Sequence, residues 1–168
     1  MQKLIFTLMI LCSYVFAFWN KPDVKPVNNQ LYLEECGSCH FAFQPGLLPQ
    51  RSWVKMMKDL EDHFGNDATL EKIDHQAILK YLEENSAQKT TEYKRSRKML
   101  DSISESSTPL EITKVKYFIH EHDEIPRRFI KQKEVGTLSN CTACHTKASK
   151  GSYDEDEIYI PNIGRWDD

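Results

Sequence analysis

Two cysteine pairs, each followed directly by a histidine, are the residues of this chain best suited to chemistry. The pattern Cys-x-x-Cys-His occurs at residues 36–40 and again at residues 141–145 of the 168. In this pattern the two thiols can form thioether bonds to one haem, and the histidine can coordinate the haem iron. We therefore expect two covalently attached haems, each with two thioethers and one proximal imidazole. The expected residues are Cys36, Cys39 and His40 in the first motif and Cys141, Cys144 and His145 in the second.

Cysteine pairs with this spacing also occur in zinc sites and in thioredoxin-like redox centres. A zinc site built from both pairs would not need a histidine directly after each second cysteine. A thioredoxin-like centre needs a neighbouring β-α-β pattern, and no alternating β-branched segment flanks either pair. Two independent disulfides would be possible in an oxidising compartment. The sequence favours haem attachment, with zinc and disulfides as the alternatives.

An apolar run near the N-terminus predicts export. Residues 4–18 are apolar apart from Thr7 and Ser13, and Lys3 precedes them. This length is typical of a secretory signal peptide and is short for a membrane span. Cleavage after Ala17 would remove residues 1–17, and the four remaining cysteines would all lie in the two motifs. We therefore expect a periplasmic mature protein; a lipid anchor on Cys12 is the disfavoured alternative, because the preceding residue is not small.

Composition and charge limit the class of protein. The formal net charge is −3, and the basic residues are scattered among as many acids, which gives no case for a nucleic-acid partner. After removal of the signal peptide, about 150 residues remain, enough for one or two compact units. Residues 85–108 are mostly polar and interrupt the apolar pattern. We expect an N-terminal haem lobe at residues 18–88 and a C-terminal haem lobe at residues 89–168.

The apolar pattern predicts a mainly α fold of short helices and long loops, with little or no β-sheet. Asn28 or Asn29 can cap a helix at residues 30–35 that leads into the first motif. Ser52 can cap an amphipathic helix that continues to Phe64. Two haems would supply much of the apolar core, so we expect the chain without them to fold poorly.

Four further elements follow from the same pattern. A helical stretch at residues 70–82 is expected in two pieces, with Asp74 as a second cap. Residues 112–119 alternate weakly and could be extended. Pro126 can open a helical turn, and Ser139 is placed to cap a helix that contains the second motif.

The far side of each iron needs a second ligand. His63 is favoured, because it lies on the apolar face of its expected helix. His75 follows an expected helix cap, where exposure to solvent is the simpler expectation. His120 and His122 are two residues apart and would point to opposite sides of an extended segment, so spacing does not choose between them. The methionines are more typical of core packing. The full set of candidates is His63, His75, His120, His122, Met56, Met57 and Met99.

Several longer runs give a resemblance to a known family. They include Leu31-Tyr32-x-Glu34-Glu35 before the first motif, Gly46-Leu47-Leu48-Pro49, Leu60-x-x-His63-Phe64-Gly65, Tyr117-Phe118-x-x-x-His122-x-Glu124-Ile125-Pro126 and Ile160-Pro161. In this order they resemble the bacterial diheme cytochrome c (DHC) family over nearly the whole mature chain. The resemblance implies bis-histidine ligation of both haems, with His63 and His122 at the distal positions.

The resemblance also implies a periplasmic electron carrier. Some members of that family are thought to serve a membrane b-type cytochrome or a small oxygen-binding haem protein, and such redox proteins are the implied partners. An iron held by two imidazoles has no open position, so we expect one-electron transfer rather than an enzyme. Two alternatives stay open: a haem that opens a coordination site for catalysis or ligand binding, and a permanent diheme subunit of a membrane redox complex.

Overall fold

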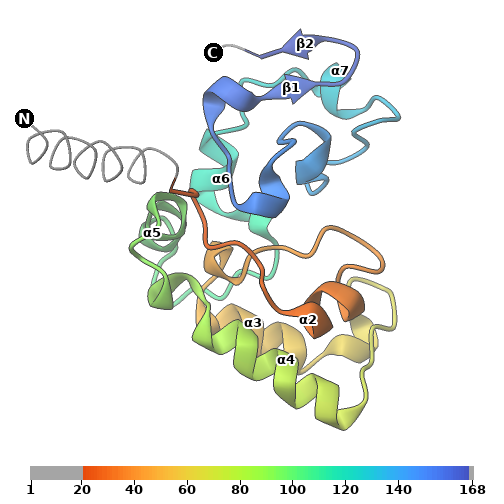
Figure 1. Ribbon diagram of the computed structural model, residues 1–168, viewed down its shortest axis with the longest axis vertical. Coiled ribbons are helices and arrows are strands. Elements are labelled where there is room, and N and C mark those ends of the chain that lie inside the picture. Colours follow the sequence, from red (N-terminus) through yellow and green to blue (C-terminus); the bar gives the residue numbers. More distant parts are fainter. Residues whose placement is uncertain (1–20, 167–168) are drawn as a thin grey trace, which may run out of the picture.

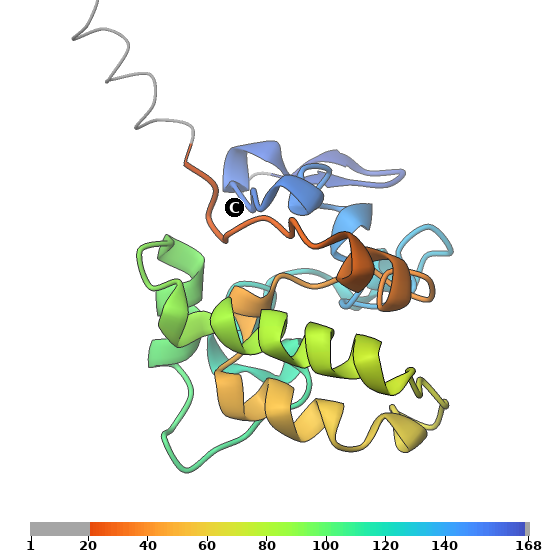
Figure 2. The same cartoon turned by 60° about the horizontal axis from the view of Figure 1, so that its bottom comes forward.

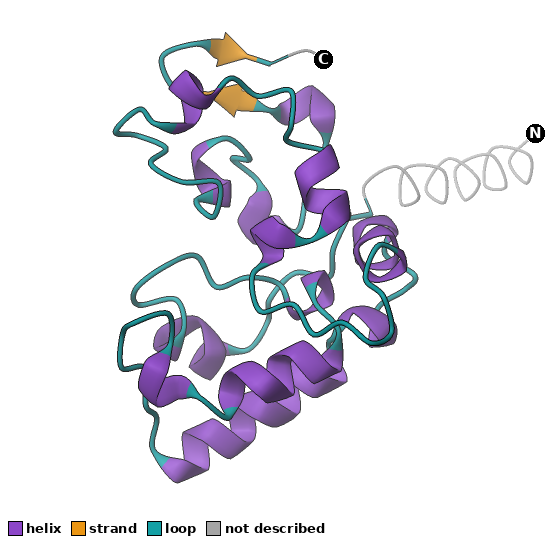
Figure 3. Ribbon diagram, turned by 180° about the vertical axis from the view of Figure 1, so that it is seen from behind, coloured by secondary structure: helices purple, strands orange, loops and turns teal. Residues whose placement is uncertain are grey.

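The computed structural model describes residues 21–166, and the predicted signal peptide at residues 1–17 lies outside them. Short helices are joined by long irregular segments (Figures 1 and 3). Within residues 21–166 there is one sheet, an antiparallel pair formed by β1 (Tyr159–Ile160) and β2 (Gly164–Arg165). The expected mainly α fold with little β-sheet is confirmed. The helices are α2 (Gln30–Glu35), α3 (Gln50–Met57), α4 (Lys72–Glu84), α5 (Lys94–Asp101), α6 (Lys116–His120) and α7 (Arg127–Ile130).

Helix α2 leads directly into the first motif, as expected. Asn29 is its N-cap, and its side-chain oxygen accepts a hydrogen bond from the Tyr32 N–H (2.8 Å). This bond satisfies one of the backbone donors that the first helical turn leaves without a partner. The helix ends at Cys36, so the first cysteine of the motif is positioned by the C-terminus of α2.

Helix α3 differs from its expected bounds. It begins at Gln50, after Pro49 as N-cap, and Ser52 is buried inside it rather than capping it. The helix ends at Met57, and a short 3-10 turn (Leu60–Asp62) follows. The expected continuation to Phe64 is wrong, because Phe64 has φ 55°, which an α-helix excludes. His63 therefore lies in a turn.

Helix α4 is one continuous helix of 13 residues, not two pieces. Glu71 is its N-cap, and Asp74 lies in its first turn. A carboxylate at this position interacts favourably with the positive end of the helix dipole without interrupting the helix. Helices α3 and α4 pack side by side and form the lower layer of the molecule (Figures 1 and 2).

The segment expected to be extended, residues 112–119, is helical instead. A 3-10 turn (Ile112–Lys114) leads into α6. The buried side chains are Ile112, Val115 and Phe118, which are three residues apart. Val115 is itself extended and separates the turn from α6, and all three side chains pack into the core. Burial in the core therefore outweighs the weak alternation of the sequence.

A buried strip crosses the middle of the molecule. Residues 44–49 contain a 3-10 turn (Pro45–Leu47) and are entirely buried. Helix α5 packs against this turn and against α6, so one apolar cluster extends from α3 and α4 to Phe118. The boundary between residues 88 and 89 stays a prediction, since this cluster includes side chains from both sides of it.

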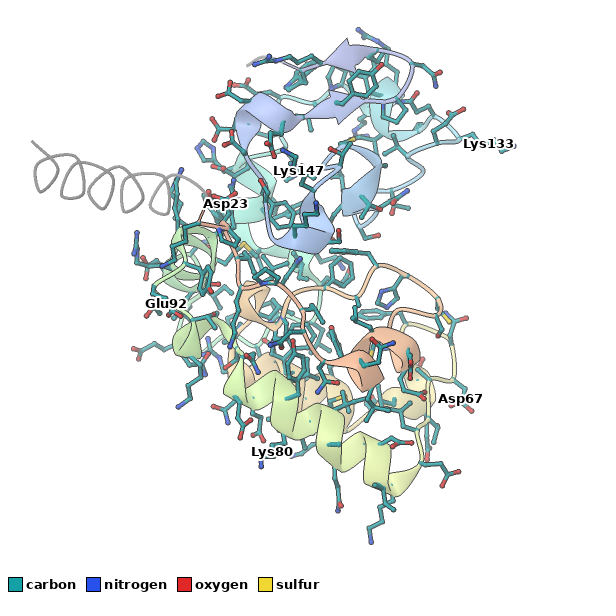
Figure 4. All side chains as sticks on the ribbon, viewed as in Figure 1. Asp23, Asp67, Lys80, Glu92, Lys133 and Lys147 are labelled. Atoms are coloured by element: carbon teal, nitrogen blue, oxygen red, sulfur yellow. The ribbon has the colours of Figure 1, made fainter. Side chains whose placement is uncertain are left out.

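The N-terminal arm, residues 21–29, also contacts the C-terminal part of the chain. The Val24 N–H donates to the Gly151 carbonyl (3.1 Å), and the Asp23 carboxylate accepts from the Tyr153 N–H (2.8 Å). Asp23 is labelled in Figure 4. Gly151 has φ 76°, and a Cβ there would lie 2.1 Å from the Val24 carbonyl oxygen. A glycine is therefore required where the arm crosses the C-terminal part.

No helix within residues 21–166 has the length and apolar content that spanning a bilayer requires.

Candidate functional site

The first motif places an exposed histidine next to a backbone acceptor. After Cys36 the chain turns, and both Cys39 and His40 are exposed. The Nδ1–H of His40 can donate to the Phe41 carbonyl (2.8 Å). In a neutral imidazole this bond fixes the proton on Nδ1 and leaves the Nε2 lone pair available for a metal ion.

His63 faces His40 from the turn that follows α3. The two ring centres are 6.1 Å apart and the rings are inclined by 21°. With metal–nitrogen bonds of about 2 Å and about 1.1 Å from nitrogen to ring centre, two axial imidazoles on one iron place their ring centres about 6 Å apart. The pair therefore fits a haem iron between the rings. Paired backbone hydrogen bonds between His63 and Asn66 (2.8 and 3.2 Å) hold the turn.

The second motif begins in a 3-10 turn (Cys141–Ala143), with Asn140 as its N-cap rather than the expected Ser139. The His145 N–H donates to the Cys141 carbonyl (2.8 Å), which closes a single turn instead of a longer helix. The His145 backbone also bridges to Ile158 just before β1. The second motif is therefore held by its own turn and by the segment that enters the sheet.

His122 is the histidine that faces His145. The ring centres are again 6.1 Å apart, here with an inclination of 69°. The Nδ1–H of His122 can donate to the Phe118 carbonyl (2.8 Å), and its ring stacks on the Phe118 ring (4.0 Å). His120 is exposed at the end of α6, although it borders the same cavity. The structure thus places the His122 ring opposite the His145 ring, and its role as an iron ligand stays a prediction.

A cavity of about 300 Å³ surrounds the second histidine pair. Its lining is mainly apolar and includes Met99, Ile112, Val135 and Ile160. An apolar cavity with two imidazoles facing each other suits a large planar cofactor better than a small polar ligand. The residues present therefore fit a haem at this site as well.

The protonation of the histidines suits metal binding. Partial burial, with the neighbouring His40, lowers the pKa of His63 below its usual value. Burial, helped by the nearby His122 and Arg95, lowers the pKa of His145 to about 4. Both imidazoles are therefore neutral at pH 7, and a neutral imidazole is the form that coordinates a metal ion.

The first cysteine of each pair does not have the low pKa of a reactive thiol. Burial raises the pKa of Cys36 and of Cys141 to about 11, so both are protonated thiols rather than reactive thiolates. None of the four cysteines within residues 21–166 is in a disulfide. The same residues contain no cluster of three or more His, Cys, Asp or Glu side chains able to hold a metal ion. The two cysteine pairs are thus not assembled into one zinc site.

The other ligand candidates have different roles. His75, expected to be exposed, is half-buried. Its ring Nε2–H can donate a hydrogen bond to the Met57 carbonyl (2.7 Å). That expectation was wrong, because α4 packs the ring against the end of α3. Met57 and Met99 are buried in the core, and Met56 packs against it, as expected of methionines.

Two residues with clear structural roles at the sites were missed from the sequence. Gln44 is fully buried; its Nε2 donates to the Ala148 carbonyl (2.5 Å), and its Oε1 accepts from the Tyr153 hydroxyl (2.7 Å). Arg95 is largely buried beside the second histidine pair. A glutamine gives no sequence signal of this kind, but Arg95 does: it lies four residues before the buried Met99, on the same face of α5.

Solved structures similar to this chain are diheme cytochromes c. A diheme cytochrome type c from Shewanella baltica OS155 is 39% identical, covering 83% of this chain and 98% of that one, with a TM-score of 0.68. A diheme cytochrome c from Rhodobacter sphaeroides is 35% identical, covering 77% of this chain and all of that one, with a TM-score of 0.69. No curated protein matches the chain in sequence.

Residues 32–153 match the family described as dihaem cytochrome c. This range includes both Cys-x-x-Cys-His motifs and both facing histidines. The family match agrees with the two covalently attached haems that the motifs predict, and each pair of facing imidazoles fits one of them. The chain belongs to the dihaem cytochrome c family, whose members carry two covalently bound haem c groups.

Proposed function

We propose that this protein transfers single electrons between redox partners through two bis-histidine haems. In this proposal Cys36 and Cys39 attach one haem, and His40 and His63 coordinate its iron. The second haem is attached and coordinated by Cys141, Cys144, His145 and His122. The observation that carries the proposal is the equal 6.1 Å separation of the two imidazole pairs.

Two imidazoles on each iron leave no position for a substrate. The chemistry that a bound haem supplies is then a change between ferric and ferrous iron with little rearrangement. The protein contributes fixed ligands: His40 and His122 can each donate their Nδ1–H to a backbone carbonyl, which prevents ring rotation. This rigidity favours an electron carrier over an enzyme.

The closeness of the two sites supports electron exchange between them. Phe41, next to the first motif, and Thr142, inside the second, line the same shallow hollow. Gln44 links the two regions through Ala148 and Tyr153, and the Tyr153 ring contacts the His145 ring (5.1 Å between centres). A buried, hydrogen-bonded link of this kind keeps the two sites at a constant separation.

The remaining parts of the proposal concern location and partners. The apolar N-terminal run and the covalent attachment of haem support export to the periplasm. We propose redox proteins as partners, with a membrane b-type cytochrome or a small oxygen-binding haem protein as the candidates from family resemblance. Contacts with them would be small and transient, as is typical of redox encounters.

A redox titration tests the function. The haem-loaded protein should take up two electrons per chain, reversibly, with no hysteresis between the reductive and oxidative directions. Fewer than two electrons, or slow irreversible steps that report ligand exchange, would contradict a bis-histidine carrier. Catalytic turnover of peroxide or nitrite by the purified protein would favour the enzyme alternative instead.

A further inference from the structure

Arg95 is a largely buried cation beside the second histidine pair. It lies in the first turn of α5, its side chain is 12% exposed, and it borders the cavity that surrounds His122 and His145. Taking a guanidinium out of water is costly unless its donors are paired with acceptors. The hydrogen-bond acceptor of each guanidinium nitrogen therefore shows which part of the side chain still needs a partner.

Its two terminal nitrogens are paired within the protein. Nη1 donates to the Glu121 carboxylate (2.6 Å) and to the Tyr117 hydroxyl (2.6 Å). Nη2 donates to the Tyr153 carbonyl (2.9 Å). The Nε–H is buried and has no hydrogen-bond partner in the part of the chain described. A buried charged donor without an acceptor is rare in native proteins and calls for a partner that the polypeptide does not supply.

The partners of Arg95 lie next to the residues that face the cavity. Tyr153, whose carbonyl accepts from Nη2, contacts the ring of His145. Glu121, which accepts from Nη1, directly precedes His122 in the chain. Three hydrogen bonds thus fix the guanidinium at the edge of the cavity around the second histidine pair. Only its Nε–H has no hydrogen-bond partner among the described residues.

We infer that the Nε–H of Arg95 donates to a propionate carboxylate of the second haem. A propionate is the anionic group of this cofactor, and hydrogen bonds from guanidinium to carboxylate are among the strongest in proteins. The inference rests on the assignment of the second haem to His122 and His145. It makes Arg95 a positioning residue that orients the haem and places a positive charge near its iron.

Other arginines near the sites are less suited to this role. Arg51 uses its Nε and Nη2 on the Ser107 and Ser104 carbonyls (2.6 and 2.9 Å). Arg127 and Arg128 are exposed, and an exposed ion pair contributes little. Arg95 is therefore the arginine with both burial and a free donor.

A crystal structure of the haem-loaded protein tests the inference directly. We expect a propionate oxygen within about 3.2 Å of Arg95 Nε. A haem seated between His122 and His145, with a water or a protein atom on Nε and its propionates elsewhere, would overturn the inference alone. A haem coordinated by other residues would overturn the site assignment as well.

Potentials measured in solution give an independent test. In Arg95→Gln we expect one of the two midpoint potentials to fall, because loss of a nearby cation favours the ferric over the ferrous state. A tenfold change in that equilibrium corresponds to about 59 mV for one electron. Arg95→Lys keeps the charge and should shift the same potential less.

Arg97→Gln is the matched control, since Arg97 is exposed on the same helix. Its two potentials should equal those of the unchanged protein. Unchanged potentials in Arg95→Gln, or an equal shift in Arg97→Gln, would overturn the inference. If Arg95→Gln fails to accumulate with haem, the structure of the unchanged protein decides the question.

Discussion

The imidazole rings of His40 and His63 lie 6.1 Å apart and are nearly parallel, at 21°. The rings of His122 and His145 have the same separation but are inclined by 69°. Equal separations fit one iron atom between each pair, whereas the different angles make the two sites inequivalent. The first pair is also more open, with His40 exposed, while the second lies in a walled cavity.

The two angles predict two different electron paramagnetic resonance signals. Nearly parallel imidazole planes separate the iron d orbitals in energy, and nearly perpendicular planes leave two of them close in energy. The oxidised protein should therefore show one rhombic low-spin signal and one highly anisotropic low-spin signal, in equal amounts. Two identical rhombic signals would contradict the orientation of His122 relative to His145.

Removal of a distal histidine should open one haem only. In His63→Ala the first iron, and in His122→Ala the second, should become high-spin in half of the total haem. His120→Ala is the matched control for the second site, because His120 is exposed two residues away. Optical spectra of the ferric and ferrous proteins check this, and a control spectrum that changed as much as that of His122→Ala would refute the assignment.

Loss of the hydrogen bonds made by Gln44 should lower the free energy of unfolding. Gln44→Leu removes the donor to Ala148 and leaves the buried Tyr153 hydroxyl without its acceptor, and an unpaired buried polar group costs about 1–3 kcal/mol. Tyr153→Phe in the Gln44→Leu background should recover part of that loss. Denaturant unfolding of the haem-loaded variants gives the free energy of unfolding of the single and of the double variant. If the two substitutions lowered it additively, the two side chains would not act together.

The close contact between Val24 in the N-terminal arm and Gly151 predicts that alanine substitutions at two glycines lower stability by different amounts. Gly136 and Gly151 have similar positive φ values, 74° and 76°, but nothing lies within 4 Å of a Cβ at Gly136. Gly136→Ala should therefore cost about 1–2 kcal/mol, the usual penalty of this conformation. Gly151→Ala should cost clearly more, because its Cβ would collide with the Val24 carbonyl. Equal losses in thermal unfolding would show that the arm does not need this close approach.

The motifs of the sequence predicted the chemistry, but only part of the positioning. The cap at Asn29 and the turn after Pro126 followed from local residue preferences, which act over a few positions. The end of α3 and the helical form of residues 112–119 depended instead on burial against distant segments. His63 was chosen for a helical face that does not exist, since it lies in a turn.

The choice between His120 and His122 shows the same limit. Residue spacing alone could not separate them, because the answer depends on how α6 ends and on which ring packs against Phe118. The partners of Arg95 come from two segments, with Tyr117 and Glu121 at α6 and Tyr153 far along the chain. The spacing from Arg95 to Met99 marks its face of α5, but the basic run around it is typical of a solvated helix surface and conceals that signal.

Addition of carbon monoxide to the reduced, haem-loaded protein tests the central claim most directly. If each iron is held by two imidazoles, the ferrous absorption spectrum should not change, because neither iron has a position free for the ligand. Prompt binding by half of the haem or more would show that at least one imidazole pair does not close on its iron. That result would contradict bis-histidine ligation and favour a ligand-binding or catalytic site.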